Sequence, residues 1–222
     1  MCGRFTQSAD LKRMTERFKV EVPQQFEFHP RYNVAPSNPV AVISASADAP
    51  RLEIMQWGIF RQWGKEKPPV FIINLQAEKL GKGSFKKALA MRRAIVPVDG
   101  FFEWKTEAGK KYPVRFTLKS QDYFGFPAVY DDPKEDLGPP LRTFTIFTTA
   151  ANSLVSKTHH RMPAILAPQD EAIWLDQKIT DPERLISLLN PHPTDEMEAY
   201  DVSPALNSPK NDTADLIKPI RR

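Results

Sequence analysis

Cysteine is nearly absent from this sequence, which carries a single one, Cys2, among 222 residues. One thiol excludes an internal disulfide framework and a zinc site built from several cysteines. Long apolar runs are also missing, because no stretch approaches the roughly 18 residues that a membrane helix needs. The first residues lack the apolar segment of a secretory signal. We therefore expect a protein without a membrane partner, in the cytosol or the nucleus.

Glycine is scarce and proline abundant, with 9 and 21 residues. The prolines lie mainly between short β-branched and aromatic runs, a pattern typical of a compact, strand-rich α+β domain with long, fixed loops. Strands are predicted at 40–44, 52–57, 70–74, 94–98, 112–118, 123–129 and 144–150. Helices are predicted after Ser8, Ser84 and Asp181. Residues 131–140 read as a polar loop and not as a boundary, so residues 1–222 are predicted to form one domain.

Excess charge is small overall, with 31 Lys and Arg against 27 Asp and Glu, for a net charge of +4. This excludes a surface that binds nucleic acid over its whole extent. Between residues 61 and 93, however, nine basic residues face only Glu66 and Glu78. This segment fits either a path for a phosphate backbone or a solvated lysine-rich surface. Within it, Trp63 fits either a stacking contact or a core position.

The position of the single cysteine is chemically suggestive. Removal of Met1 would give Cys2 a free α-amine, with a pKa of about 7.7–8.0, beside its thiol. Such an amine attacks an aldehyde to form an imine, and the thiol then closes a thiazolidine ring. Alternatively, the thiol attacks an acyl carbon while the amine acts as base, as in N-terminal-nucleophile amidohydrolases. On this feature alone, a cysteine that merely happens to follow the initiator Met is the better interpretation.

Two further strings contain acid–base groups. DGFFEW (99–104) places Glu103 among aromatic residues, where burial would raise its pKa and suit it to proton transfer. THHRMP (158–163) places His159 and His160 beside an arginine. Each string also has a plain structural interpretation, as a carboxylate at a strand end and a histidine that caps a turn.

Six short strings, taken together, indicate a protein family far more specifically than any one of them does. MCGRF, RYNVAP (31–36), MQWG (55–58), DGFFEW, THHRMP and VSPALNSPKND occur in an order that resembles the SRAP (SOS-response-associated peptidase) family, from residue 2 to about residue 220. The resemblance implies a strand-rich, barrel-like domain with a few peripheral helices and a DNA groove leading to Cys2. It also implies covalent capture of abasic sites in single-stranded DNA. Four histidines and one thiol form no clear set of ligands, so no metal or organic cofactor is expected.

The resemblance assigns roles to four residues. Cys2 corresponds to the cysteine that links to the ring-opened abasic sugar through a thiazolidine. Asn74 is expected to hydrogen-bond the opened sugar or the N-terminus. Glu103 is expected to shuttle protons during imine formation and ring closure. His159 is expected to protonate the sugar oxygen during ring opening and to assist reversal.

The resemblance also implies contacts to DNA, with two departures from the family pattern. The expected DNA-binding residues are Arg4, Trp63, Gln76, Lys86, Lys87 and Arg161. Gln76 stands where the family usually has a phosphate-binding arginine, which removes one charge-assisted hydrogen bond. His160 stands where an aspartate is common, and a second imidazole would lower the pKa of His159. The lysines that would compensate for the lost arginine are Lys79, Lys82, Lys86 and Lys87.

Two other functions remain open from the sequence. A class II glutamine amidotransferase-like hydrolase also matures to a Cys-Gly N-terminus, although the usual asparagine–glycine pair is missing. A non-catalytic DNA-binding module would bind reversibly without Cys2. Peptidase activity is expected at most as self-removal of Met1. The resemblance further suggests a monomer, cytoplasmic and nucleoid-associated if bacterial or nuclear if eukaryotic.

Overall fold

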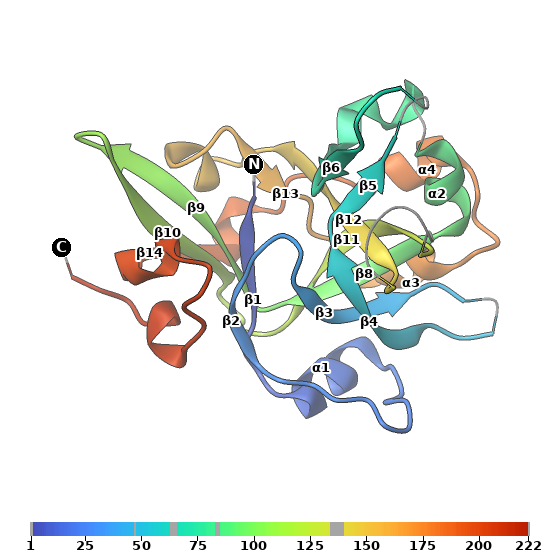
Figure 1. Ribbon diagram of the computed structural model, residues 1–222, viewed down its shortest axis with the longest axis horizontal. Coiled ribbons are helices and arrows are strands. Elements are labelled where there is room, and N and C mark those ends of the chain that lie inside the picture. The colour runs from blue at the N-terminus through green and yellow to red at the C-terminus, as the bar shows by residue number, and fades with distance from the viewer. Residues whose placement is uncertain (1, 47, 63–65, 83–84, 134–139, 222) are drawn as a thin grey trace.

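The computed structural model describes residues 2–221 except 47, 63–65, 83–84 and 134–139. Two sheets dominate the described part (Figure 1). The first has the order β14 (Met197–Asp201), β10 (Lys110–Leu118), β9 (Gly100–Glu107), β1 (Arg4–Gln7) and β2 (Arg31–Val34). The second has the order β11 (Phe124–Asp131), β8 (Arg93–Val98), β3 (Pro39–Ser44), β4 (Arg51–Trp57), β12 (Thr143–Ala150) and β13 (Arg161–Pro163).

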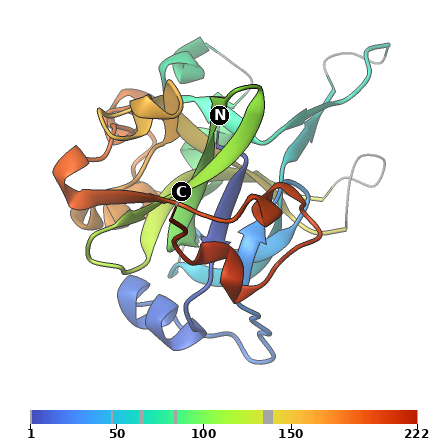
Figure 2. The ribbon, with the colours of Figure 1, turned by 90° about the vertical axis from the view of Figure 1, so that its left-hand side faces the viewer.

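The second sheet curls until its strands meet. β11 pairs with β12 as well as with β8, so part of the sheet is ring-like without forming a true barrel. β7 (Asn74–Gln76) runs parallel to β12, and β5 (Ile59–Arg61) pairs with β6 (Val70–Ile72) in a hairpin that projects at the upper right of Figure 2. The predicted strand-rich α+β class is thus confirmed, and the barrel-like core takes this partly ring-like form.

Helices lie at the periphery of the sheets (Figure 1). The α-helices are α1 (Leu11–Phe18), α2 (Lys86–Met91), α3 (Pro168–Leu175) and α4 (Pro182–Ile186). Short 3-10 turns are η1 (Ala77–Lys82), η2 (Val155–Lys157), η3 (Thr194–Glu196), η4 (Pro204–Asn207) and η5 (Ala214–Ile217). In the part of the chain that the structure describes, no helix is both long and apolar enough to cross a membrane.

Sequence and structure differ at several elements. The run predicted as one strand at 70–74 forms two strands with different partners, β6 and β7. Asp10, and not Ser8, caps α1, because its side chain accepts a hydrogen bond from Arg13 N. Ser84 lies outside the described residues, and Phe85 precedes α2. Asp181 caps α4 as predicted.

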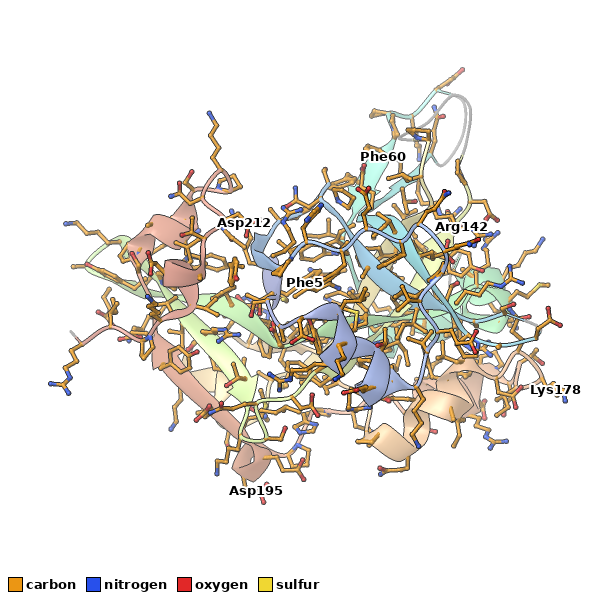
Figure 3. The ribbon with its side chains drawn as sticks, turned by 90° about the horizontal axis from the view of Figure 1, so that it is seen from below. Phe5, Phe60, Arg142, Lys178, Asp195 and Asp212 are labelled. Atoms are coloured by element: carbon orange, nitrogen blue, oxygen red, sulfur yellow. The ribbon has the colours of Figure 1, made fainter. Side chains whose placement is uncertain are left out.

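Aromatic side chains fill the space between the sheets. Phe5 is fully buried against Trp57 and Phe126, with ring centroids 4.9 and 6.1 Å away, and Figure 3 shows it in the middle of the molecule. The buried Gln7 side chain joins β1 to the second sheet, since its Nε2 donates to the carbonyl oxygens of Ala41 and Pro97, both at 2.8 Å. β1 therefore pairs with strands of the first sheet and is hydrogen-bonded to the second, which fixes the position of the residues that precede it.

The C-terminal segment lies over β2. The Asp212 carboxylate accepts hydrogen bonds from the Arg31 side chain and from the backbone N–H groups of Tyr32 and Asn33 (Figure 3). Asn33 Nδ2 is within hydrogen-bonding distance of three tail carbonyls, those of Leu206, Ser208 and Asn211. These contacts tie the tail to the sheet that carries β1.

Gly58 provides a test of local backbone strain. Its φ is +115°, and a Cβ atom there would lie 2.1 Å from Cζ of Phe71. We expect Gly58→Ala to lower the free energy of unfolding by about 2 kcal/mol, because it adds both strain and a clash. Chemical denaturation would measure this. Gly109→Ala is the matched control, because φ is +76° there and no atom lies within 4 Å of the added Cβ. Equal losses of unfolding free energy in the two variants would show that the clash with Phe71 contributes nothing.

Candidate functional site

Cys2 lies just before β1, the strand that pairs with β9. The strands are antiparallel, with Arg4 opposite Phe102, so the residues before Arg4 continue toward Glu103. The Cys2 side chain is fully buried, and its Sγ donates to the carbonyl oxygen of Arg4 at 3.4 Å. Burial, and after it the negative charge of Glu103, raises the pKa of the Cys2 thiol. The thiol is therefore held protonated and close to a carboxyl group.

Asn74 reaches Cys2 from the second sheet. β7 carries it beside β12, with Asn74 opposite Ile146. Asn74 Nδ2 donates to the carbonyl oxygen of Cys2 at 2.8 Å. Its buried Oδ1 accepts no hydrogen bond from the described residues, and a buried acceptor of this kind is uncommon in proteins. Asn74 thus fixes the backbone of Cys2 and presents one further acceptor.

Glu103 lies on β9 with its side chain only 4% exposed. Burial raises its pKa to about 7, well above the ordinary value for a carboxyl group. A group with this pKa is partly protonated near neutral pH, so it can both give and accept a proton there.

His159 enters the site from the loop between η2 and β13. Its Nδ1 lies 4.0 Å from Oε1 of Glu103 and accepts a hydrogen bond from Arg161 N at 3.0 Å. A neutral imidazole in this arrangement carries its proton on Nε2. Burial lowers the pKa of His159, and the neighbouring charges of His160 and Arg161 lower it further. The His160 ring stacks on that of His159, with centroids 4.4 Å apart.

Cys2, Asn74, Glu103 and His159 thus come together from four places in the chain. Glu103 lies on β9 of the first sheet, and Cys2 lies just before β1 of the same sheet. Asn74 lies on β7 of the second sheet, and His159 lies in the loop before β13. A nucleophile beside a carboxyl group and an imidazole can add to an electrophilic carbon while protons move between the two acid–base groups.

The Arg4 side chain makes several contacts within the protein. Its Nη1 donates to Asn33 Oδ1 at 2.7 Å and to the carbonyl oxygen of Leu206 at 2.9 Å. Its guanidinium lies 5.8 Å from the ring centroid of Trp104, whose Nε1 donates to Asn207 Oδ1 at 2.6 Å. Trp104 was not among the predicted site residues, although it directly follows Glu103 in the sequence. Arg4 and Trp104 together form a cationic and aromatic rim next to the site.

The other predicted DNA contacts are dispersed. Gln76 is half-buried on β7, two residues after Asn74. Lys86 and Lys87 are exposed on α2, which Figure 1 places well away from the start of β1. Trp63 lies outside the described residues, so its role stays a prediction. The role of Lys86 and Lys87 as DNA contacts also stays a prediction.

Arg161 lies next to the site, but its side chain is engaged. Its two terminal nitrogens donate to the two Glu78 carboxylate oxygens, at 2.8 and 2.9 Å. Among the described residues, no three His, Cys, Asp or Glu side chains gather as metal ligands. Independence of a metal or cofactor stays a prediction.

The fold and site define a strand-rich protein with an N-terminal thiol beside a buried carboxyl group and an imidazole. The chain belongs to the SRAP family, the SOS response associated peptidases, whose family model matches residues 1–209. This confirms the resemblance that the sequence strings indicated.

Relatives of known name span the whole chain. It is 44% identical to the abasic site processing protein YoqW of Bacillus subtilis, over 98% of this chain and 99% of that protein. It is 32% identical to the abasic site processing protein YedK of Escherichia coli, over 99% and 100% of the two chains. A crystal structure of a Bacteroides thetaiotaomicron protein matches with a TM-score of 0.83 and 26% identity, over 99% and 100% of the two chains.

Proposed function

We propose that this protein processes abasic sites in DNA by capturing them covalently at Cys2. One observation carries the proposal: the amide, carboxyl group and imidazole of three separate strings gather around the Cys2 end of β1. The names of the relatives, abasic site processing proteins that align over nearly the whole chain, support the same substrate. The product is a thiazolidine that joins residue 2 to the sugar.

The reaction begins with opening of the abasic sugar. The bond between the anomeric carbon and the ring oxygen breaks; His159 gives a proton to that oxygen, and the Glu103 carboxylate takes the proton of the anomeric hydroxyl. This leaves an aldehyde beside the α-amine that Cys2 carries once Met1 has been removed. Burial shifts the two pKa values in opposite directions: it raises that of Glu103 to about 7 and lowers that of His159, so a protonated His159 gives up its proton readily.

Capture then follows in two bond-forming steps. The α-amine adds to the aldehyde carbon, and one of its protons moves to the carbonyl oxygen. Glu103 then gives its proton to the resulting hydroxyl, which leaves as water, while His159 takes the second amine proton, and this gives an imine. The Cys2 sulfur adds to the imine carbon, and the thiol proton passes to the nitrogen. One water leaves in total and nothing is oxidised or reduced. Because its raised pKa keeps the thiol protonated, the attack of the sulfur needs a base, and the Glu103 carboxylate relays the thiol proton to the nitrogen.

The partner we propose is single-stranded DNA that carries an abasic site. Asn74 Oδ1 would accept a hydrogen bond from a sugar hydroxyl or from the Cys2 amine. Arg4 and Trp104 would meet the strand beside the lesion through charge and stacking. We propose a monomer as the acting species and a place in the cellular response to DNA damage.

A denaturing gel tests the proposed function. Purified protein, with the mass of its mature N-terminus verified, is incubated with a single-stranded oligonucleotide that carries one abasic site. We expect a shifted band that survives denaturation and is missing with an intact oligonucleotide of the same sequence. Reversible binding without a band would favour a simple DNA-binding module, and glutamine hydrolysis in place of a band would favour an amidohydrolase.

A further inference from the structure

Arg161 forms a two-point ion pair that nothing in the proposed chemistry uses. Besides the two hydrogen bonds to Glu78, its Nη2 donates to the carbonyl oxygen of Thr148 at 2.6 Å. The Arg161 side chain is only 12% exposed, whereas that of Glu78 is 53% exposed. Paired hydrogen bonds between a guanidinium and a carboxylate fix geometry as well as charge. The arginine is therefore held in one orientation.

This ion pair joins the two segments that carry the site. Glu78 lies at the start of η1, directly after β7, whereas Arg161 opens β13. Both strands flank β12, where Thr148 pairs with Gln76 and Ala150 pairs with Arg161. The ion pair thus crosses β12 and fixes the end of β13 against the segment that carries Asn74.

Arg161 in turn fixes the His159 ring. The His159 Nδ1 atom lies 3.0 Å from Arg161 N and 3.1 Å from Arg161 O, so the imidazole is oriented by the backbone of the residue that Glu78 holds. A shift of the Arg161 backbone would turn the ring and move its proton-bearing Nε2. Displacements of about 1 Å at a reacting group are enough to slow a reaction strongly.

We propose that Glu78 is a positioning residue, which acts through Arg161 to orient His159 for proton transfer. The inference rests on the proposed function and adds to it a residue outside the reacting groups. It gives the Glu of the INLQAE string (73–78) a role in the site. Because the Glu78 side chain is half exposed and glutamine keeps an oxygen that accepts a hydrogen bond from Arg161, substitution of Glu78 tests positioning with little effect on stability.

The test separates rate from affinity. We expect Glu78→Gln to slow formation of the covalent band at least about tenfold at saturating abasic oligonucleotide. Its dissociation constant for the intact oligonucleotide should stay within about twofold of the unsubstituted protein. Glu16→Gln is the matched control, because it removes a carboxylate from an exposed ion pair with Lys12 on α1. It should change neither quantity.

Double substitution tests whether the effect runs through Arg161. If it does, Glu78→Gln combined with Arg161→Gln should be no slower than Arg161→Gln alone. Multiplied effects would overturn the inference, as would an unchanged rate in Glu78→Gln. An unchanged rate with tighter binding of the intact oligonucleotide would instead make Arg161 a phosphate contact that Glu78 masks. Failure of the unsubstituted protein to form a band would overturn the proposed function itself.

Discussion

Replacement of Cys2 by alanine is expected to reduce the covalent band by at least about a hundredfold. The variant keeps an α-amine after Met1 is removed, so it still forms an imine with the aldehyde. Without a sulfur to close the ring, that imine hydrolyses during denaturation. Borohydride reduces the imine to a stable amine, and the band should then reappear. The measurement is a denaturing gel with and without borohydride.

Two features make this test decisive. Cys2 is the only cysteine in the chain, so no other thiol can substitute for it. Removal of the buried sulfur leaves a small cavity, and a thermal unfolding curve would verify that the variant stays folded. A full band from Cys2→Ala without borohydride would contradict the account, because it would require a stable adduct that does not depend on the Cys2 sulfur.

Glu103→Gln is expected to slow capture about a hundredfold, the usual size of a lost general acid–base group. Glutamine has nearly the same shape but cannot exchange a proton, so binding of the intact oligonucleotide should change little. Glu107→Gln is the matched control, since Glu107 lies on the same strand and is 54% exposed. The rate of band formation across pH 5 to 9 is the measurement. The unsubstituted protein and Glu107→Gln should show an inflection of this rate near pH 7, which Glu103→Gln should lack. An inflection that persists in Glu103→Gln would contradict its assignment to Glu103.

The same carboxyl group should reduce stability at high pH. Its pKa is raised to about 7 in the folded protein, so the folded state binds the proton more tightly than the unfolded state. The resulting stability is fully present below the ordinary pKa of about 4.5 and is lost as pH rises through 7. Glu103→Gln should therefore melt higher than the unsubstituted protein at pH 8, with a smaller difference at pH 5. Equal melting temperatures of Glu103→Gln and the unsubstituted protein at pH 8 would show that burial does not raise the pKa of Glu103.

The residues of the candidate site could be predicted from the sequence because each belongs to a distinct string. Cys2, Glu103 and His159 stand out by residue type and neighbours, and the resemblance added Asn74. Their convergence depends on the pairing of β1 with β9 and of β7 with β12, which no local pattern encodes. The structure was needed to bring an amide at residue 74 within 2.8 Å of the backbone of residue 2.

Other features carried too weak a signal in the sequence. α3 was missed because one of its two buried residues is Glu171, which is held by Arg17 and disturbs the apolar spacing. Residues 70–73 are all strong β formers, so nothing in them marks the point where the chain changes sheets. The Glu78–Arg161 pair joins residues 83 positions apart, and only tertiary structure brings them together.

The most direct test of the account is the mass of the covalent adduct. The account predicts a mass equal to the chain without Met1 plus the abasic oligonucleotide minus one water. Fragmentation of the digested adduct should place the sugar on both the nitrogen and the sulfur of residue 2. An adduct that retains Met1, or one that is attached through a lysine, would contradict thiazolidine formation at Cys2.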